Sequence, residues 1–92
     1  MDDRLAEQNA QPAALRALAQ NLARDTADLA ARIAQTQDEV ARVHEDIARD
    51  AVSRIAAAAL EHAEHARRFA EHERREQQRW SSVADLLCPP PA

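Results

Sequence analysis

The sequence predicts an all-α protein, and three observations support this. The chain contains no glycine, and no proline occurs between Pro12 and Pro89, so no strong helix breaker lies in that span. Alanine, leucine, arginine, glutamine and glutamate, which all favour helices, make up most of it. Large aliphatic residues recur with helical periodicity from Leu15 to Ile47. We therefore expect one long amphipathic coiled-coil helix over about residues 13–79, followed by a short C-terminal helical turn.

The N-terminal residues are polar, and we expect them to be disordered. Pro12 suits the first turn of a helix, where its missing N–H is not needed. The expected organisation is a disordered segment at 1–11, a coiled-coil region at 12–80, and a short helical turn with a proline-rich tail at 81–92.

The large aliphatic residues form a narrow stripe along the expected helix. With successive residues placed about 100° apart, eight of them fall within an arc of about 80°. Ile55 continues the stripe. Such a stripe on a long helix has to be covered by another chain or by another part of the same chain. We predict that it is an oligomer seam, formed by Leu15, Leu18, Leu22, Leu29, Ile33, Val40, Val43, Ile47 and Ile55.

An antiparallel two-helix hairpin that breaks near residues 50–53 is the alternative fold. In that fold the second half of the chain would cover the stripe of the first half. The expected turn, "RDAVS", lacks the glycine or asparagine that commonly ends a helix. We therefore favour the continuous helix.

Charged residues are also spaced as on a helix. Acidic residues precede arginine by four positions, the favourable order for an ion pair along a helix, in six cases. The six pairs are Asp28–Arg32, Asp38–Arg42, Glu45–Arg49, Asp50–Arg54, Glu64–Arg68 and Glu71–Arg75.

The C-terminal end holds the most hydrophobic cluster of the chain. Ser82 and Asp85 have the spacing of a capping box, which predicts a new helical turn from Val83 to Cys88. We expect this end to dock onto a partner through Phe69, Trp80, Val83, Leu86 and Leu87.

Three histidines, His62, His65 and His72, lie in the stretch "LEHAEHARRFAEHE". A shared metal ion needs ligands that converge on one point, and His65 and His72 are two helical turns apart. We therefore expect no metal site. We interpret these histidines first as residues at the edge of the seam that are hydrated or hydrogen-bonded to a glutamate of a partner. The alternative is that they are pH-sensitive residues whose protonation between neutral pH and about pH 5 would oppose association. His44 has no ligand spacing around it and is set apart from this group.

The charge balance argues against several partners. The net charge is −4, and the arginines between residues 61 and 79 are matched by equally many glutamates, so nucleic acid is an unlikely partner. No apolar run approaches about 18 residues, so we expect no membrane span. The acidic N-terminus does not resemble a signal peptide, and a lone Cys88 fits a reducing cytoplasm. Abundant alanine, with arginine as the only basic residue besides histidine, suggests a GC-rich bacterial genome.

These observations indicate a protein that works by association. One or two helices cannot by themselves build a concave catalytic pocket, so we expect neither an enzyme nor a cofactor. We predict a small structural or adaptor protein that acts through coiled-coil self-association or by binding another helical protein. The alternative is a helical regulatory or nucleic-acid-associated factor that uses the arginine-rich C-terminal half.

Overall fold

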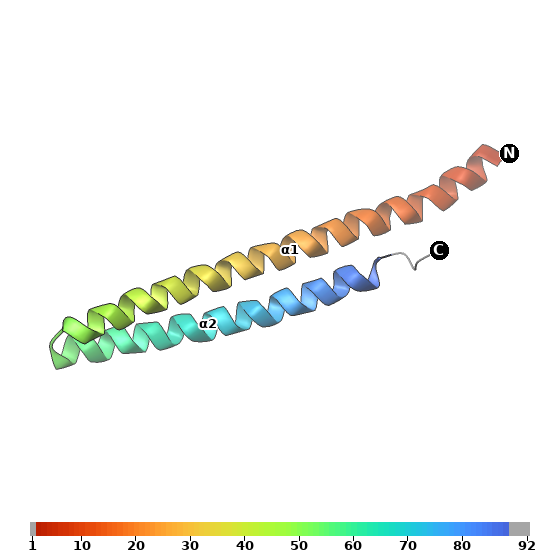
Figure 1. Cartoon of the computed structure of the whole chain (residues 1–92). Coiled ribbons are helices and arrows are strands. Elements are labelled where there is room, and N and C mark those ends of the chain that lie inside the picture. Colours follow the sequence, from red (N-terminus) through yellow and green to blue (C-terminus); the bar gives the residue numbers. More distant parts are fainter. Residues whose placement is uncertain (1, 89–92) are drawn as a thin grey trace.

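A computed structural model of the chain describes residues 2–88, with side chains from residue 12 onward, and shows two α-helices (Figure 1). Helix α1 runs from Asp2 to Asp50 and helix α2 from Ser53 to Leu86. The helices lie side by side and antiparallel, in a rod with extents of 78 × 20 × 12 Å (Figure 1). The all-α prediction is confirmed. The fold is the hairpin, so the single continuous helix over 13–79 is wrong.

The turn of the hairpin consists of Ala51 and Val52. Val52 is extended, with φ −67° and ψ 156°, and its carbonyl accepts the N–H of Ala56 at 2.9 Å as α2 begins. No residue from 2 to 88 has a positive φ. The expected need for glycine or asparagine was therefore wrong, because one extended residue reverses the chain at this point.

The helical region begins earlier than predicted. Helix α1 starts at Asp2, so the segment expected to be disordered before Pro12 is helical from residue 2 onward, and Pro12 lies inside the helix. Proline removes only one N–H from the hydrogen-bond ladder, and good helix formers stand on both sides of it.

The C-terminal end also differs from the prediction. Helix α2 continues without a break to Leu86, so Ser82 lies inside it and does not cap a new turn. No helix breaker precedes Ser82, so nothing interrupts the ladder there. The last turn closes with hydrogen bonds from the Leu87 N–H to the Val83 carbonyl (3.1 Å) and from the Cys88 N–H to the Asp85 carbonyl (3.2 Å). The tail at 89–92 lies outside the described residues.

Alanine forms the interface between the two helices. The buried apolar residues, each 0–4% exposed, are Ala23, Ala27, Ala30, Ala34, Ala41, Ala59, Ala63, Ala66, Ala70 and Ala84. Their spacings fit alternating steps of three and four residues, the heptad pattern in which positions a and d face the partner helix. We call these a and d positions the alanine seam.

The heptad can be followed along both helices. In α1 the a positions are 20, 27, 34, 41 and 48, and the d positions are 23, 30, 37 and 44. In α2 the a positions are 56, 63, 70, 77 and 84, and the d positions are 59, 66, 73, 80 and 87. Each of these residues is buried or half-buried. The seam therefore keeps one register over the whole overlap of the helices.

Alanine has a physical consequence for stability. Small side chains allow the helix axes to approach the lower end of the usual 8–10 Å separation, roughly 8 Å. A buried methyl group contributes only about 0.8 kcal/mol, against about 1.5–3 kcal/mol for a buried leucine or isoleucine. The seam is thus close-packed but buries little apolar area, which makes the isolated hairpin marginally stable.

Candidate interaction surface

One side of the hairpin is held by ion pairs between the helices. Asp38 of α1 pairs with both Arg67 (3.8 Å) and Arg74 of α2, and Glu45 pairs with Arg67. All four residues occupy heptad position e, next to the seam. We call this the ionic side.

The expected pairs Asp38–Arg42 and Glu45–Arg49 do not form. Both carboxylates pair with arginines of α2 instead. Two of the six expected pairs are present, Glu64–Arg68 at 2.7 Å and Glu71–Arg75 at 3.3 Å. Ion pairs thus contribute to the register between the helices as well as to each helix.

The other side of the seam is marked by a pair of histidines. His44, at a d position of α1, lies opposite His62, at a g position of α2, with ring centroids 5.2 Å apart. When two helices run antiparallel, the e positions of both lie on one side of the seam and the g positions of both lie on the other. The ion pairs and the histidine pair show these two sides directly.

Large apolar side chains follow the g side along both helices, at positions g and c. Leu22 is 67% exposed and Leu86 is 84% exposed, whereas Ile33 and Val83 are half-buried. We call this surface the aliphatic face. Its members are Leu15, Leu22, Leu29, Ile33, Val40, Val43 and Ile47 of α1, with Ile55, Phe69, Val83 and Leu86 of α2.

The predicted oligomer seam maps onto this face. Eight of its nine residues belong to the aliphatic face, and Leu18 lies beside it at position f. The expectation that a hairpin would bury the stripe between its own helices is wrong, because alanines occupy the a and d positions there. Whether another chain covers the stripe stays a prediction.

The predicted docking residues divide into two groups. Phe69, Val83 and Leu86 belong to the aliphatic face. Trp80 and Leu87 occupy d positions and are half-buried, so they contribute to the hairpin itself. The Arg79 guanidinium lies 6.0 Å from the centre of the Trp80 ring, which favours a cation–π contact.

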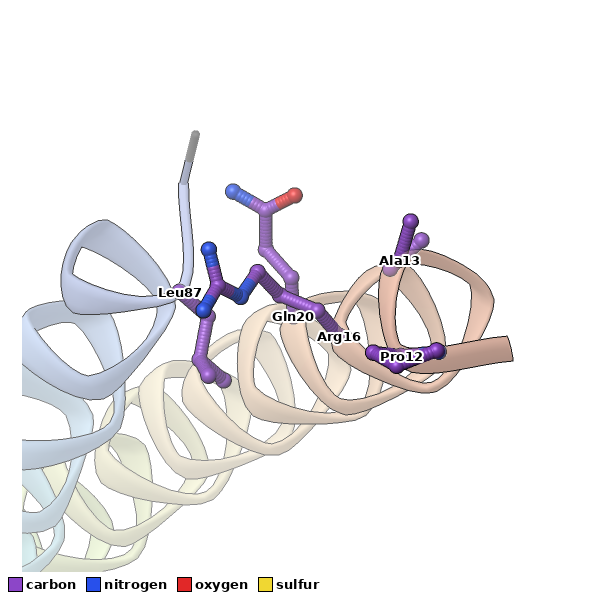
Figure 2. A pocket seen from close by; sticks show the side chains of 6 residues that line it. Pro12, Ala13, Arg16, Gln20 and Leu87 are labelled. Atoms are coloured by element: carbon purple, nitrogen blue, oxygen red, sulfur yellow. The ribbon is translucent and has the colours of Figure 1, made fainter. Parts of the chain in front are cut away.

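A hollow lies at the open end of the hairpin, where α1 extends beyond α2 (Figure 2). It has a volume of about 440 Å³. Figure 2 shows Leu87 lying against α1, with the Arg16 side chain extending toward it. The Gln20 Nε2 atom donates a hydrogen bond to the Ala84 carbonyl at 3.2 Å. The residues that line the hollow are Pro12, Ala13, Arg16, Ala17, Gln20 and Leu87.

The three predicted pH-sensitive histidines share the g side. His62 is at position g, and His65 and His72 are at position c, all of them exposed. Their effect on association stays a prediction. Sequence reasoning missed His44, because it considered spacing along one helix only. Gln20 contacts Ala84, and Asp38 contacts Arg67. The same register between the helices places His44 next to His62.

Over residues 2–88, no three or more histidine, cysteine, aspartate or glutamate side chains gather as metal ligands would. Within the same range, neither helix is both long enough and apolar enough to cross a membrane.

The five arginines between residues 61 and 79 are all paired with carboxylates. Arg67 and Arg74 pair with α1, and the other three pair within α2. Those three pairs are Arg68–Glu64, Arg75–Glu71 and Arg79–Glu76. This arrangement neutralises the cluster that the nucleic-acid alternative would use.

No protein-family model, curated protein or solved structure matches this chain. The two unlike sides of the hairpin are therefore the basis for a functional proposal.

Proposed function

We propose that this protein is a small structural or adaptor protein that buries its aliphatic face against the apolar face of a helical partner, including a second copy of itself. One observation carries the proposal. The interface between the two helices buries alanines, and most of the large aliphatic side chains stay exposed on one side of the hairpin. Exposed apolar patches of this kind mark association surfaces in proteins.

The size of the aliphatic face supports a stable contact. A half-exposed aliphatic side chain presents roughly 40–60 Å² of apolar surface, about half of what full burial removes from water. Eleven such side chains give about 400–700 Å². A standard protein interface buries about 800 Å² on each partner, of which somewhat more than half is apolar. The face therefore has about the apolar content that one side of such an interface needs.

The shape of the face favours a helical partner. It follows two antiparallel helices from Leu22 to Ile47 and back from Ile55 to Val83, a length of about 40 Å at roughly 1.5 Å per residue. The side chains of α1 and α2 form ridges along it, and ridges of this kind pack into the grooves of another helix. One helix would complete a three-helix bundle, and a second hairpin would complete a four-helix bundle.

Electrostatics do not favour the alternative of a nucleic-acid-associated factor. The five arginines of α2 between residues 61 and 79 have carboxylate partners, and the net charge is −4. Phosphate binding by Arg67 or Arg74 would have to break ion pairs that help hold α2 to α1. We also place the protein in the cytoplasm, because a lone cysteine suits a reducing compartment.

Two matched substitutions test the proposal. Leu29 lies on the aliphatic face and is 57% exposed, and Leu60 lies on the ionic side and is 53% exposed. Both are replaced by arginine, and the molecular mass is measured by sedimentation equilibrium over a concentration series. We expect the unmodified chain and Leu60→Arg to self-associate, and Leu29→Arg to lose at least tenfold in affinity because it would bury an unpaired charge.

Circular dichroism of the same samples checks that each variant keeps its helices. A chain that stays monomeric at every concentration would exclude self-association and leave only a different helical protein as the partner. Equal weakening by Leu29→Arg and Leu60→Arg would contradict the aliphatic face as the contact surface.

A further inference from the structure

The histidine pair at the edge of the seam has a geometry that the proposed association does not explain. His44 and His62 come from different helices, and their ring centroids lie 5.2 Å apart with the ring planes at 30°. His44 is half-buried at its d position, and His62 is exposed beside it.

This separation suits two imidazoles that share one metal ion. A zinc–nitrogen bond is about 2.0–2.1 Å long, so two imidazoles on one tetrahedral ion have ring centres about 5 Å apart. Neutral imidazole is the commonest protein ligand of divalent transition metals. The spacing along α2 keeps His65 and His72 from sharing one ion, but pairing across the hairpin brings in a ligand from α1.

We propose that His44 and His62 form a two-ligand site for a divalent transition-metal ion of the class that prefers imidazole nitrogen, with Zn²⁺ as its representative. Since no group of three or more ligand side chains gathers among residues 2–88, water completes the coordination. Such a site binds more weakly than a structural zinc site with four protein ligands.

The position of the pair gives the ion a defined effect. His44 lies six residues before the end of α1 and His62 nine residues after the start of α2, so the ion joins the helices near their connection. An ion that binds the folded hairpin and not the unfolded chain stabilises the fold. It also fixes the register of a seam whose alanines contribute little each.

Zn²⁺ titration of the tag-free chain tests the proposal. Thermal unfolding is followed by circular dichroism at pH 7.5 and a fixed protein concentration. At a Zn²⁺ concentration about one hundred times the dissociation constant, we expect the midpoint to rise on the order of 10 °C.

Four substitutions locate the ligands. His44→Ala and His62→Ala should each abolish the rise in midpoint, whereas His65→Ala and His72→Ala should keep it. Alanine at position 44 matches the neighbouring seam residues, so that variant should fold. The same Zn²⁺ titration is done with Leu29→Arg. The rise in unfolding midpoint should persist there even if association is lost, so the metal-site proposal and the association proposal can fail independently of each other.

Two results would overturn the proposal. One is an unmodified chain whose midpoint does not respond to Zn²⁺ at pH 7.5. The other is a response that survives His44→Ala but disappears in His62→Ala and His65→Ala, because that pattern would place the ion on α2 alone.

Discussion

The alanine seam and the aliphatic face run along the same two helices, yet the seam is buried and the face is exposed. The buried alanines of the seam are 0–4% exposed, whereas Leu22, one residue before the seam position at Ala23, is 67% exposed. If side-chain size decided burial, the leucines would lie between the helices. The comparison teaches that regular spacing, rather than size, selects the face that closes this hairpin.

The physical reason lies in the two periodicities. The seam residues keep alternating steps of three and four along each helix, so a pair of slightly supercoiled helices stays in contact along its whole overlap. The aliphatic residues sit at c and g, which lie to one side of that contact line. Small seam residues also bring the backbones close together, which leaves no room for larger side chains between them.

The largest effect should come from a charge placed in the seam. Ala70 is 0% exposed, and Ala70→Glu would bury an uncompensated carboxylate in a close-packed interface. We expect a cost of at least about 3 kcal/mol, enough to unfold most of a small hairpin. Loss of helical signal by circular dichroism measures this.

Ala57→Glu is the matched control, because Ala57 is exposed on the same helix. It should leave the unfolding midpoint within about 3 °C, the effect of roughly half a kcal/mol. Equal damage from the two substitutions would mean that the seam does not hold the helices together.

Much of the fold could be predicted from the sequence, but the seam was missed. The absence of glycine and of internal proline after Pro12 indicated helix, and the alternative fold placed the turn at 50–53. The choice of the continuous helix failed because a two-residue turn with extended Val52 carries no sequence signal like that of glycine. With 23 alanines in 92 residues, the heptad pattern of alanine was hidden by alanine elsewhere.

The candidate surface was predicted in part for the same reason. Periodicity along one helix placed eight aliphatic residues on one stripe, and in the structure seven of them lie on the aliphatic face, with Leu18 beside it. Periodicity did not show which residues of α2 complete the aliphatic face, because that depends on the register between the helices. Trp80 was expected to dock onto a partner, yet its d position turns it toward α1, and His44 was set apart although it meets His62.

A smaller effect, in the stabilising direction, is expected at the turn. Val52 is the N-cap residue of α2 and makes no side-chain hydrogen bond to the helix, and the first turn of α2 contains no acidic residue. Val52→Asp would supply both a cap and a favourable charge, worth about 1 kcal/mol. A higher unfolding midpoint would show that a better turn adds to a weak seam, whereas Val52→Ala should leave the midpoint unchanged.

The ionic side should contribute less than the seam. Asp38 has an 18% exposed side chain and pairs with two arginines of α2 that are about half exposed. We expect Asp38→Ala to cost about 0.5–1 kcal/mol, after allowance for screening by solvent. Glu71→Ala, which removes an exposed pair within α2, should cost only about 0.3–0.5 kcal/mol. Urea unfolding at low and high salt measures both, and the two costs should converge as salt rises.

The smallest effect on the hairpin should come from the largest apolar residues. Leu22→Ala removes most of a leucine side chain, which costs about 2–5 kcal/mol where leucine is buried. At protein concentrations low enough to keep the chain monomeric, we expect less than about 0.5 kcal/mol, because Leu22 contributes little to the packing of α1 on α2. At high concentration the same substitution should lower the midpoint, since it weakens the contact that the aliphatic face makes with another copy. A cost of 2 kcal/mol or more in the dilute sample would mean that Leu22 packs inside the hairpin, and the distinction between seam and face would then be wrong.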